Sequence, residues 1–409
     1  MSAPSTVAPL PVAAAAPPAG KQHLHYIDLV RVLTVALVIA VHVLGQEALP
    51  GTVTAGALLA VGHVSREVFF LLTAFVLAYT YRSKPVRPLS FWRKRFLYVG
   101  LPYLAWSLIY FLADSPDLNP LGPALQTFAD TVLHATARYH LYFLLVSMQI
   151  YLVFPLIRAL LKATRRHHLI LLAVAGAYQI LFYLAVQENW SVGPFTWLLR
   201  PPDAWLTSYL GFVIAGGVAA WHAQTLADWT RKRMSWVFTA AAATIVAGLA
   251  VYFGEVLLGG QNPLVASDVF QPVVVIESVG VAWAFLALGL RWQDRGRRAG
   301  RLIHAGADAS FGIYLAHPLL IQGLFMLTSA VGVTALAQRD PTVAVLVEMV
   351  VFVPLLYLAS GLLAAGFRRT PFSLLLAGRA RLRPRPVPVT DRIPLPFTNR
   401  PLPTQGGTS

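Results

Sequence analysis

Residues 25–45, HYIDLVRVLTVALVIAVHVLG, decide the fold, because this stretch has the length and the apolar character of a membrane-crossing helix. Within this stretch lie the ionisable side chains Asp28, Arg31 and His42. An ionisable group inside a bilayer costs several kcal/mol unless it faces a bundle interior or a water-filled cavity. The stretch therefore predicts a helix whose polar face points into a bundle.

The whole chain has the composition of a membrane protein. Its 409 residues are 57% hydrophobic and 12% charged, about half the charged fraction of a soluble domain. This composition predicts one polytopic, all-α membrane domain. The chain contains no cysteine, which excludes a thiol nucleophile, a thiolate metal site and a disulfide.

About ten apolar runs are long enough to cross a bilayer as helices. They cover residues 27–46, 57–79, 96–113, 139–160, 168–187, 204–221, 236–258, 270–290, 309–331 and 343–367. The predicted fold is a transmembrane helix bundle over residues 25–368. Residues 1–24, rich in Ala and Pro, and residues 369–409, rich in Arg and Pro, are predicted to be disordered tails.

Lys and Arg residues predict the orientation of the bundle. One set of loops contains YRSKPVRPLSFWRKR, KATRRHH, TRKRM and RWQDRGRRAGR, whereas the opposite set holds only Arg138, Arg200 and Arg339. Because basic loops stay in the cytosol, these loops and both termini are expected to be cytosolic. The same pattern accounts for most of the net charge of +15 without a nucleic-acid partner.

The first helix is expected to present a polar stripe. Each residue of an α-helix turns by about 100° and rises by about 1.5 Å, so Arg31 and His42 lie about 20° apart around the axis and about 16 Å apart along it. Asp28 precedes Arg31 by three residues, close enough to pair with it. The alternative is structural, with Asp28 and Arg31 as an anchoring pair and His42 hydrogen-bonded to a neighbouring helix.

Other ionisable side chains fall inside the apolar runs, and those in the outer half predict, together with His42, a polar cavity open to the outer side. They are His63, Arg66, Glu67, Glu277 and Glu348, whereas His317 lies nearer mid-depth. Arg66 and Glu67 are adjacent and are expected to point in different directions without a need to pair. Each of these groups alone could be structural, and a buried glutamate could be protonated.

A basic cluster, Arg93, Lys94 and Arg95, precedes the third run on the cytosolic side. Positive residues commonly flank membrane helices, but this cluster could also clamp the phosphates of a cytosolic anionic cofactor. The pair His167 and His168 lies in a basic loop without carboxylates, so no metal site is expected.

The ten residues between Arg31 and His42 give a spacing that resembles the Arg-X10-His signature of the integral-membrane acyltransferase-3 family. Four further stretches are similar to motifs of that family, in the same order, within residues 26–367. They are VFFLLTAFVLAYTY, FWRKRFLYVGLPYLAWSLIY, YHLYFLLVSMQIYLVFPLI and ASFGIYLAHPLLI. Together these stretches are more specific than any one of them.

The resemblance implies transfer of an acyl group, acetyl or succinyl-like, from cytosolic acyl-CoA to a hydroxyl of a glycan, an envelope sugar or a macrolide. It implies that His42 is the catalytic base and Arg31 its partner, and that Arg93 and Arg95 belong to the loop that handles acyl-CoA. Arg66, Glu67, Glu277, Glu348 and His317 are then expected to bind the acceptor. No metal is implied.

Two departures from the family pattern stand out. Thr73-Ala74-Phe75 replaces the usual Ser-Gly-Phe, and Tyr98 stands where a second basic residue is often found. No hydrolase-like domain follows the last apolar run, so the chain is expected to modify its acceptor directly or to rely on envelope-synthesis partners. A composition rich in Gly, Ala and Arg favours a bacterial plasma membrane as its location.

Three other classes of protein remain open. A polysaccharide or lipid-linked sugar exporter would use a polar cavity equally well, but would consume no acyl-CoA. An ion-coupled transporter would be favoured by inverted repeats with broken helices, of which no corresponding pair is found. A scaffold without catalysis fits poorly with so many buried ionisable groups.

Overall fold

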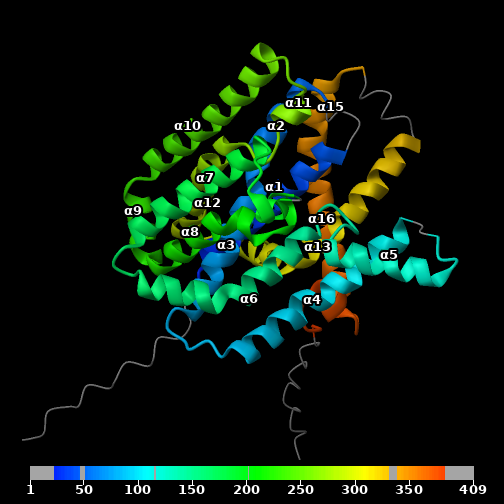
Figure 1. Ribbon diagram of the computed structural model, residues 1–409, viewed down its shortest axis with the longest axis horizontal. Helices are drawn as coiled ribbons and strands as arrows, with labels where there is room; N and C mark the ends of the chain where they lie inside the picture. The colour runs from blue at the N-terminus through cyan, green and yellow to red at the C-terminus, as the bar shows by residue number, and fades with distance from the viewer. Residues whose placement is uncertain (1–22, 47–50, 115–116, 201, 331–338, 383–409) are drawn as a thin grey trace, which may run out of the picture.

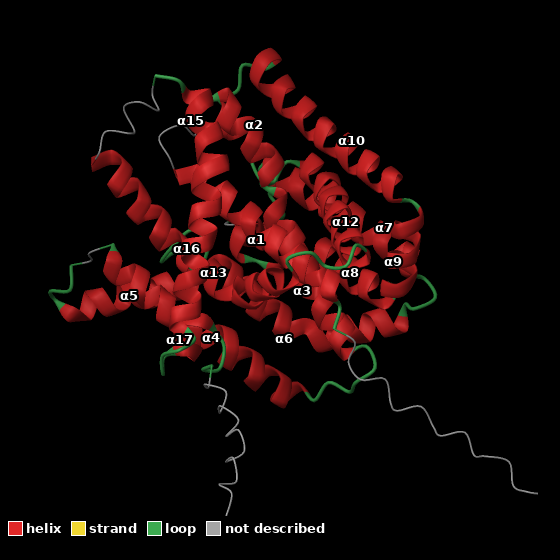
Figure 2. Cartoon of the chain, turned by 180° about the vertical axis from the view of Figure 1, so that it is seen from behind, coloured by secondary structure: helices red, strands yellow, loops and turns green. Residues whose placement is uncertain are grey.

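The computed structural model describes residues 23–46, 51–114, 117–200, 202–330 and 339–382, and within these residues all regular structure is helical (Figures 1 and 2). This confirms the predicted all-α class. Nine helices of the described part are long and apolar enough to cross a membrane. The number rises to ten if one sharply bent pair of helices is counted as a single span.

The helices follow one another along the chain, mostly with short connections. They are α1 (His25–Gln46), α2 (Val53–Gly62), α3 (Val64–Tyr81), α4 (Pro88–Ala113), α5 (Leu121–His134), α6 (Tyr142–Ala163), α7 (His168–Gln187), α8 (Leu210–Trp221), α9 (Ala223–Lys232), α10 (Met234–Phe253), α11 (Pro263–Ala266), α12 (Pro272–Asp294), α13 (Gly300–Ala330), α15 (Pro341–Val347), α16 (Val353–Phe367) and α17 (Ser373–Ala377). Short 3-10 helices η1 (Gly193–Leu199), η2 (Pro202–Ala204) and η3 (Leu206–Tyr209) connect α7 to α8, and single π-helical turns, η4 (Gly254–Leu258) and η5 (Glu348–Phe352), follow α10 and precede α16.

The predicted spans differ from the structure mainly where the chain bends. The second span runs over Val53–Tyr81, and α2 and α3 meet at His63 within it. The sixth is the bent pair, in which the helix axis turns by 85° between Leu206–Trp221 and Ala223–Lys232. Hydropathy detects apolar length but not the direction of the axis, so the sequence predicts the span and misses the bend.

Helix α1 occupies the centre of the bundle (Figure 1). It packs against α12 and α3 on one side and against α13 and α16 on the other. Its buried Val35, Ile39 and Val43 belong to a core shared with α13 and α16. A helix surrounded in this way can keep ionisable side chains out of lipid, as the first stretch of the sequence requires.

Helices α3 and α8 approach each other closely, and glycine makes this approach possible. A Cβ atom at Gly216 of α8 would collide with the backbone carbonyl oxygen of Leu71 in α3. Small residues at helix interfaces let backbones pack closely in membranes, where apolar burial alone does not drive helices together.

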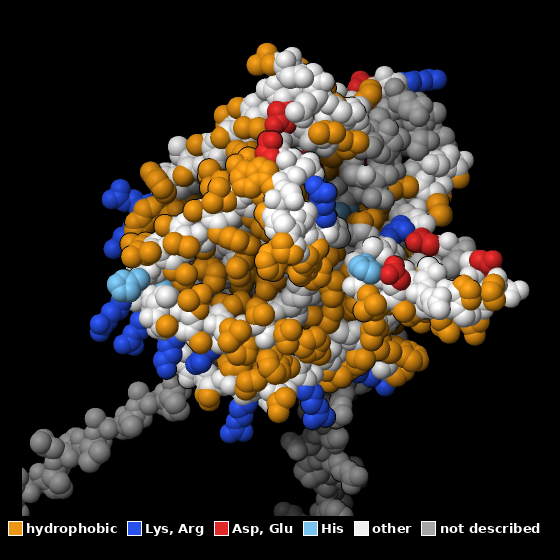
Figure 3. Space-filling model, viewed as in Figure 1, with side chains coloured by type: hydrophobic (Ala, Val, Ile, Leu, Met, Phe, Trp, Pro, Cys, Tyr) orange, Lys and Arg blue, Asp and Glu red, His pale blue; other side chains and the backbone are white. Residues whose placement is uncertain are grey.

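Residues 369–382, which the sequence places in the C-terminal tail, include α17, which packs against α4, α13 and α16. Figure 3 shows Lys and Arg side chains gathered mainly along the lower and left edges of the molecule, with most acidic side chains in the upper part and on the right. This distribution agrees with the charge asymmetry of the loops.

Candidate functional site

Two histidines from opposite ends of the chain meet in the bundle interior. Nδ1 of His42 in α1 lies 2.7 Å from Nε2 of His317 in α13, and the two rings are nearly parallel, with centroids 5.0 Å apart. His317 is completely buried, whereas His42 is half-buried. The sequence predicts both residues at a site, but not their direct contact.

The hydrogen bonds define which nitrogen of each ring carries the proton. Nδ1 of His317 lies 2.7 Å from the backbone oxygen of Tyr314, and a carbonyl oxygen can only accept. In a neutral ring, Nδ1 of His317 therefore donates and Nε2 accepts, so Nδ1 of His42 must donate to it. Nε2 of His42 is left with a free lone pair. This nitrogen makes no hydrogen bond within the described residues. It also keeps some solvent-accessible surface, since it is not one of their fully buried atoms that lack a partner.

An aromatic and imidazole shell surrounds this pair. The ring of Tyr139 meets the ring of His42 edge-on at 4.7 Å, and His140 meets His317 at 5.3 Å. Both ring nitrogens of His140 and the hydroxyl of Tyr139 are buried without a hydrogen-bond partner within the described residues. His140 precedes the span Tyr142–Ala163, and burial, followed by the nearby His317 and His42, lowers its pKa well below the usual value.

A pocket of about 680 Å³ opens next to this shell. Tyr139 lines it, together with Arg138 and with Ile321, Gln322 and Phe325 of α13. The guanidinium of Arg138 donates to Oε1 of Gln322 at 2.9 Å and forms an ion pair with Asp114 at 3.2 Å. Donors and acceptors of this kind suit a ligand rich in hydroxyl groups.

A second pocket, of about 600 Å³, lies at the basic end of the bundle and is lined by four cations, Lys94, Arg95, Arg368 and Arg379. Only Arg379 has a carboxylate partner within the described residues, Asp308 at 3.1 Å. The Nε atoms of Arg95 and Arg368 are buried without a hydrogen-bond partner in the same part of the chain. This donor pocket, as we call it, therefore has an excess of positive charge that an anion would neutralise.

The family resemblance implies that Arg93 and Arg95 both handle acyl-CoA, and the structure places only Arg95 at this pocket. Arg95 lines the donor pocket with its guanidinium 5.4 Å from the ring centre of Tyr151, whereas Arg93 is exposed and does not line it. Lys94 takes the second place at the pocket wall. Successive residues of a helix are about 100° apart, so three consecutive basic residues cannot all face one pocket.

Aromatic side chains form a partition between the donor pocket and the histidine pair. Phe69 and Phe143 line the pocket, and their rings meet edge-on at 4.3 Å. Tyr314 packs against Phe143 at 5.3 Å and against His317 at 5.7 Å. The contacts thus continue from the pocket wall to the imidazoles through three rings.

Arg31 is half-buried in α1 and makes no hydrogen bond or ion pair within the described residues. The expected pairing with Asp28 is not present. Oδ2 of Asp28 instead lies 2.7 Å from Nε2 of His23 and 2.5 Å from Nδ1 of His304. The pairing is different because α13 brings an imidazole to the same carboxylate, which helical spacing within α1 does not reveal.

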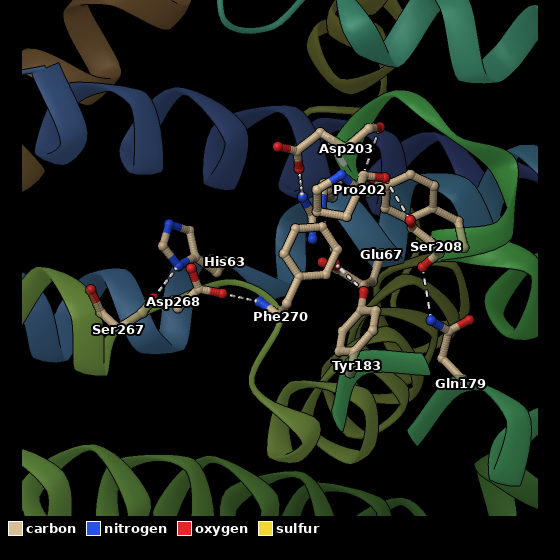
Figure 4. Close-up of polar contacts among 12 residues, drawn as sticks. His63, Glu67, Gln179, Tyr183, Pro202, Asp203, Ser208, Ser267, Asp268 and Phe270 are labelled. Carbon is tan, nitrogen blue, oxygen red and sulfur yellow. Dashed lines mark hydrogen bonds and ion pairs between the residues drawn. The ribbon is translucent and has the colours of Figure 1, made fainter. Parts of the chain in front are cut away.

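Arg66 and Glu67 contradict the expectation that they point apart. Nε of Arg66 donates to Oε1 of Glu67 at 2.9 Å, and its Nη1 pairs with Asp203 at 2.5 Å. Tyr183 donates its hydroxyl to Glu67 at 2.8 Å (Figure 4). The guanidinium also lies 4.4 Å from the ring centre of Phe270. A long arginine side chain can fold back on its neighbour when the surroundings are apolar. The cluster is therefore buried and ion-paired, while Nη2 of Arg66 and Oε2 of Glu67 have no hydrogen-bond partner within the described residues.

Glu277 and Glu348 are buried too, but the structure does not join them to the histidine pair. Glu277 in α12 is 1% exposed, and its Oε1 has no hydrogen-bond partner in the described part of the chain. Its carboxylate lies over Gly248 of α10, where a Cβ would collide with it. Glu348 begins the π-helical turn η5 and is 4% exposed. Neither glutamate makes a hydrogen bond or an ion pair with His42 or His317, so direct contacts within the described residues do not hold the expected outer cluster together.

A group that could hold a metal ion lies at the basic end of α1. His23, His25, Asp28 and His304 each offer a ligand atom, and these atoms lie within 4.8 Å of one another. The sequence leads to the expectation of no metal site, and that expectation rests on the adjacent pair His167 and His168. It does not consider this group of residues. Spacing along the chain does not reveal a cluster that is completed by a residue of another helix. His168 is in fact paired with His222, at 2.9 Å.

Several residues of the site escape prediction from the sequence. Arg138, Tyr139 and His140 form the run RYH just before α6, where three polar residues precede an apolar helix. Arg368 lies at the predicted end of the bundle, and Arg379 lies in the predicted tail. Nothing in the sequence links these two residues to Arg95, because Arg368 ends α16 and Arg379 follows α17, and only the packing of these helices brings them to the pocket.

The family comparison agrees with this geometry. A family model described as an acyltransferase domain matches residues 24–369. The chain belongs to the acyltransferase-3 family. Comparison with curated proteins gives no match, and comparison with solved structures gives none. Membership in this family and the apolar helices together describe a multi-pass membrane acyltransferase.

Proposed function

We propose that the protein is a membrane-embedded O-acyltransferase that moves an acetyl or succinyl-like group from cytosolic acyl-CoA to a hydroxyl of a carbohydrate or glycosylated acceptor. His42 is the general base. One observation carries the proposal: the chain of hydrogen bonds from Tyr314 through His317 orients His42 and leaves its Nε2 free to take a proton.

The donor pocket supports acyl-CoA as the donor. Lys94, Arg95 and Arg368 have no carboxylate partner within the described residues, and a CoA nucleotide brings several phosphate charges. Arginine binds phosphate through a planar fork of N–H groups, and an anion here would supply the partners that the buried Nε atoms lack. The thioester arm would then extend toward Phe69, Phe143 and the histidine pair.

The pocket beside Tyr139 supports a polyhydroxylated acceptor. Arg138 and Gln322 offer donors and acceptors at its wall, and the aromatic rings of Tyr139 and Phe325 offer apolar faces. A sugar ring presents both kinds of surface. In this assignment His317 orients the base instead of binding the acceptor, and Arg66 and Glu67 hold the bundle together. Glu277 and Glu348 remain predicted acceptor-side residues.

The reaction follows from the free lone pair of His42. A hydroxyl is a poor nucleophile until a base within hydrogen-bond reach accepts its proton, which is typically worth about 10²- to 10⁴-fold in rate. The hydroxyl oxygen bonds to the thioester carbon while its proton passes to Nε2 of His42. The carbon–sulfur bond then breaks, and the leaving CoA sulfur takes that proton. Arg31 lies about 16 Å from His42 along α1, next to Arg379 and Tyr151 of the donor pocket, and it has no carboxylate partner within the described residues. Its guanidinium would therefore add to the positive charge that attracts the acyl-CoA phosphates.

The location proposed is a bacterial plasma membrane, with the basic loops and both termini in the cytosol and with envelope-synthesis proteins as partners. The gathering of Lys and Arg mainly along the lower and left edges of the molecule supports this orientation (Figure 3). It also puts the donor pocket on the side where acyl-CoA is found.

Transfer from labelled acyl-CoA in isolated membranes tests the proposal. Membranes with the wild-type protein should label a carbohydrate acceptor, and His42→Ala should lose about 10²-fold or more of that activity at equal expression. His134→Ala, which removes an exposed histidine of α5, is the matched control and should keep it. Equal labelling by His42→Ala would rule out His42 as the base.

An exporter of lipid-linked sugars is the second candidate, and the two open pockets on different sides of the histidine pair favour it. An exporter consumes no acyl-CoA. Release of free CoA that depends on both the wild-type protein and an acceptor would exclude it. Sugar translocation without CoA release would replace the first proposal.

A further inference from the structure

Three histidines and one aspartate converge where the chain enters the bundle. His23 and His25 lie at the entry to α1, Asp28 is in the first turn of that helix, and His304 is near the start of α13. The four ligand atoms that they offer lie within 4.8 Å of one another. Two segments that are 276 residues apart in sequence, at Asp28 and His304, thus meet at one point.

The hydrogen bonds in this group are concentrated on one oxygen. Nε2 of His23 lies 2.7 Å and Nδ1 of His304 lies 2.5 Å from the same atom, Oδ2 of Asp28. The carboxylate is nearly completely buried, at 4% exposure. Nδ1 of His25 is also buried and has no hydrogen-bond partner within the described residues. Since a buried polar atom without a partner costs free energy, the group is incomplete as it stands.

We propose that His23, His25, Asp28 and His304 bind one divalent transition-metal ion of the Zn²⁺ class. Imidazole nitrogens are preferred ligands of Zn²⁺, and three of them with one carboxylate complete a tetrahedral set. Zn–N bonds of about 2.0–2.1 Å put ligand atoms about 3.3 Å apart in a tetrahedron. The distances between the ligand atoms run from 2.5 Å to 4.8 Å, so they include values shorter and longer than this one.

The movements needed fall on side chains that are free to make them. The side chain of His23 is 59% exposed and that of His304 is 35% exposed, so both rings can turn outward from Asp28. The exposed side of His23 also gives the ion a path from solvent. The metal takes the place of the proton on each of these nitrogens, and in a neutral ring that proton moves to the other ring nitrogen.

The site joins the ends of two helices that matter elsewhere. Helix α1 carries Arg31 and His42, and α13 carries His317. An ion bound to His25 and Asp28 of one helix and to His304 of the other would fix their relative position at the basic end. Metal binding and its effect on stability do not depend on the proposed acyl transfer.

Binding of Zn²⁺ to the purified full-length protein in detergent tests the inference. After treatment with a chelator and dialysis, the wild type should bind one Zn²⁺ per chain by titration calorimetry and by metal analysis. It should also unfold at a higher temperature with Zn²⁺, because a ligand that binds only the folded state stabilises it. His304→Ala and His25→Ala should weaken binding at least about tenfold and lose the thermal shift.

Two further variants keep the test decisive. His23→Ala changes an exposed side chain that packs little, so it should fold normally and bind Zn²⁺ more weakly. His167→Ala removes an exposed histidine at the same end of the bundle and should bind like the wild type. Absence of binding to the wild type, or wild-type affinity in both His23→Ala and His304→Ala, would overturn the inference.

Discussion

His42 and His317 are separated by 275 residues in the sequence, and yet Nδ1 of one ring lies 2.7 Å from Nε2 of the other. The carbonyl of Tyr314 accepts from the far side of His317, which fixes the direction of both hydrogen bonds. His42 donates to His317, and His317 donates to the backbone carbonyl of Tyr314. A chain of hydrogen bonds like this orients a catalytic imidazole. The two histidines therefore have different proposed roles: His42 accepts the proton, and His317 orients His42.

Replacement of His317 tests this division of roles. In His317→Leu nothing accepts from Nδ1 of His42, so the ring loses its preferred tautomer and orientation, and kcat for acyl transfer should fall about 10²-fold or more. His317→Gln offers an amide oxygen to His42 and an amide N–H to the carbonyl of Tyr314, and it should recover part of that loss. Acyl transfer and KM for the acceptor are measured for both variants.

The comparison of the two variants distinguishes orientation from packing. If His317 merely fills space, the apolar Leu variant should be at least as active as the Gln variant. A change confined to KM would instead support the prediction from the sequence that His317 binds the acceptor.

Arg95 and Arg93 provide a matched test of the donor pocket. Arg95 lines it, and Arg93, two residues before it in the chain, is exposed outside it. Hydrogen bonds to a charged group are worth about 1.5–3 kcal/mol, so Arg95→Gln should raise KM for acyl-CoA by about 10- to 100-fold. Arg93→Gln should change KM less than about threefold, since exposed charges are screened by salt. Equal effects of the two substitutions would show that only the general positive charge of this face matters.

The fold can be predicted from the sequence because membrane helices are recognisable by their apolar length. The all-α class and the family are both predicted and confirmed. The charge pattern of the loops also agrees with the distribution on the surface (Figure 3). These properties depend on composition within single segments, which a sequence displays directly.

The candidate site is predictable only in part, because contacts between helices do not follow from the spacing within one helix. His42 and His317 both stand out in the sequence as ionisable residues in apolar runs, but their pairing depends on how α13 packs against α1. Helical spacing pairs the carboxylate of Asp28 with Arg31, one turn away. In the structure, His304 contacts that carboxylate from another helix.

The ion pair of Arg66 and Glu67 predicts a large effect on stability. Glu67 is completely buried and pairs with Arg66, so removal of Arg66 leaves a carboxylate without a cation inside the bundle. Arg66→Met should therefore cost about 3–5 kcal/mol of stability. The double variant Arg66→Met with Glu67→Leu removes both buried charges and should recover much of that cost, since the side chain of Asp203, the other partner of Arg66, is 45% exposed. The unfolding midpoint of the purified protein is the measurement.

A surface pair supplies the control for this prediction. Asp130 and His134 pair at 3.1 Å, and their side chains are 72% and 60% exposed. Exposed pairs contribute about 0–1 kcal/mol, so Asp130→Asn should hardly move the midpoint. If Arg66→Met were as mild as Asp130→Asn, the ion pair of Arg66 and Glu67 would not be a structural element of the bundle.

His140 predicts that the protein loses stability in mild acid. Burial, with His317 and His42 nearby, lowers the pKa of His140 well below 6.5 in the folded protein. Below pH 6.5 the unfolded chain binds a proton at this residue and the folded protein does not, so the free energy of unfolding falls as the pH falls. The slope from one such group is at most about 1.4 kcal/mol per pH unit, and it vanishes above about pH 7.

Unfolding midpoints at about pH 8, 6 and 5 should therefore decline for the wild type and decline less for His140→Asn. His134→Asn, an exposed replacement in α5, should follow the wild type. Parallel curves for the wild type and His140→Asn would mean that His140 is protonated equally well in both states, and the buried position described for it would then be wrong.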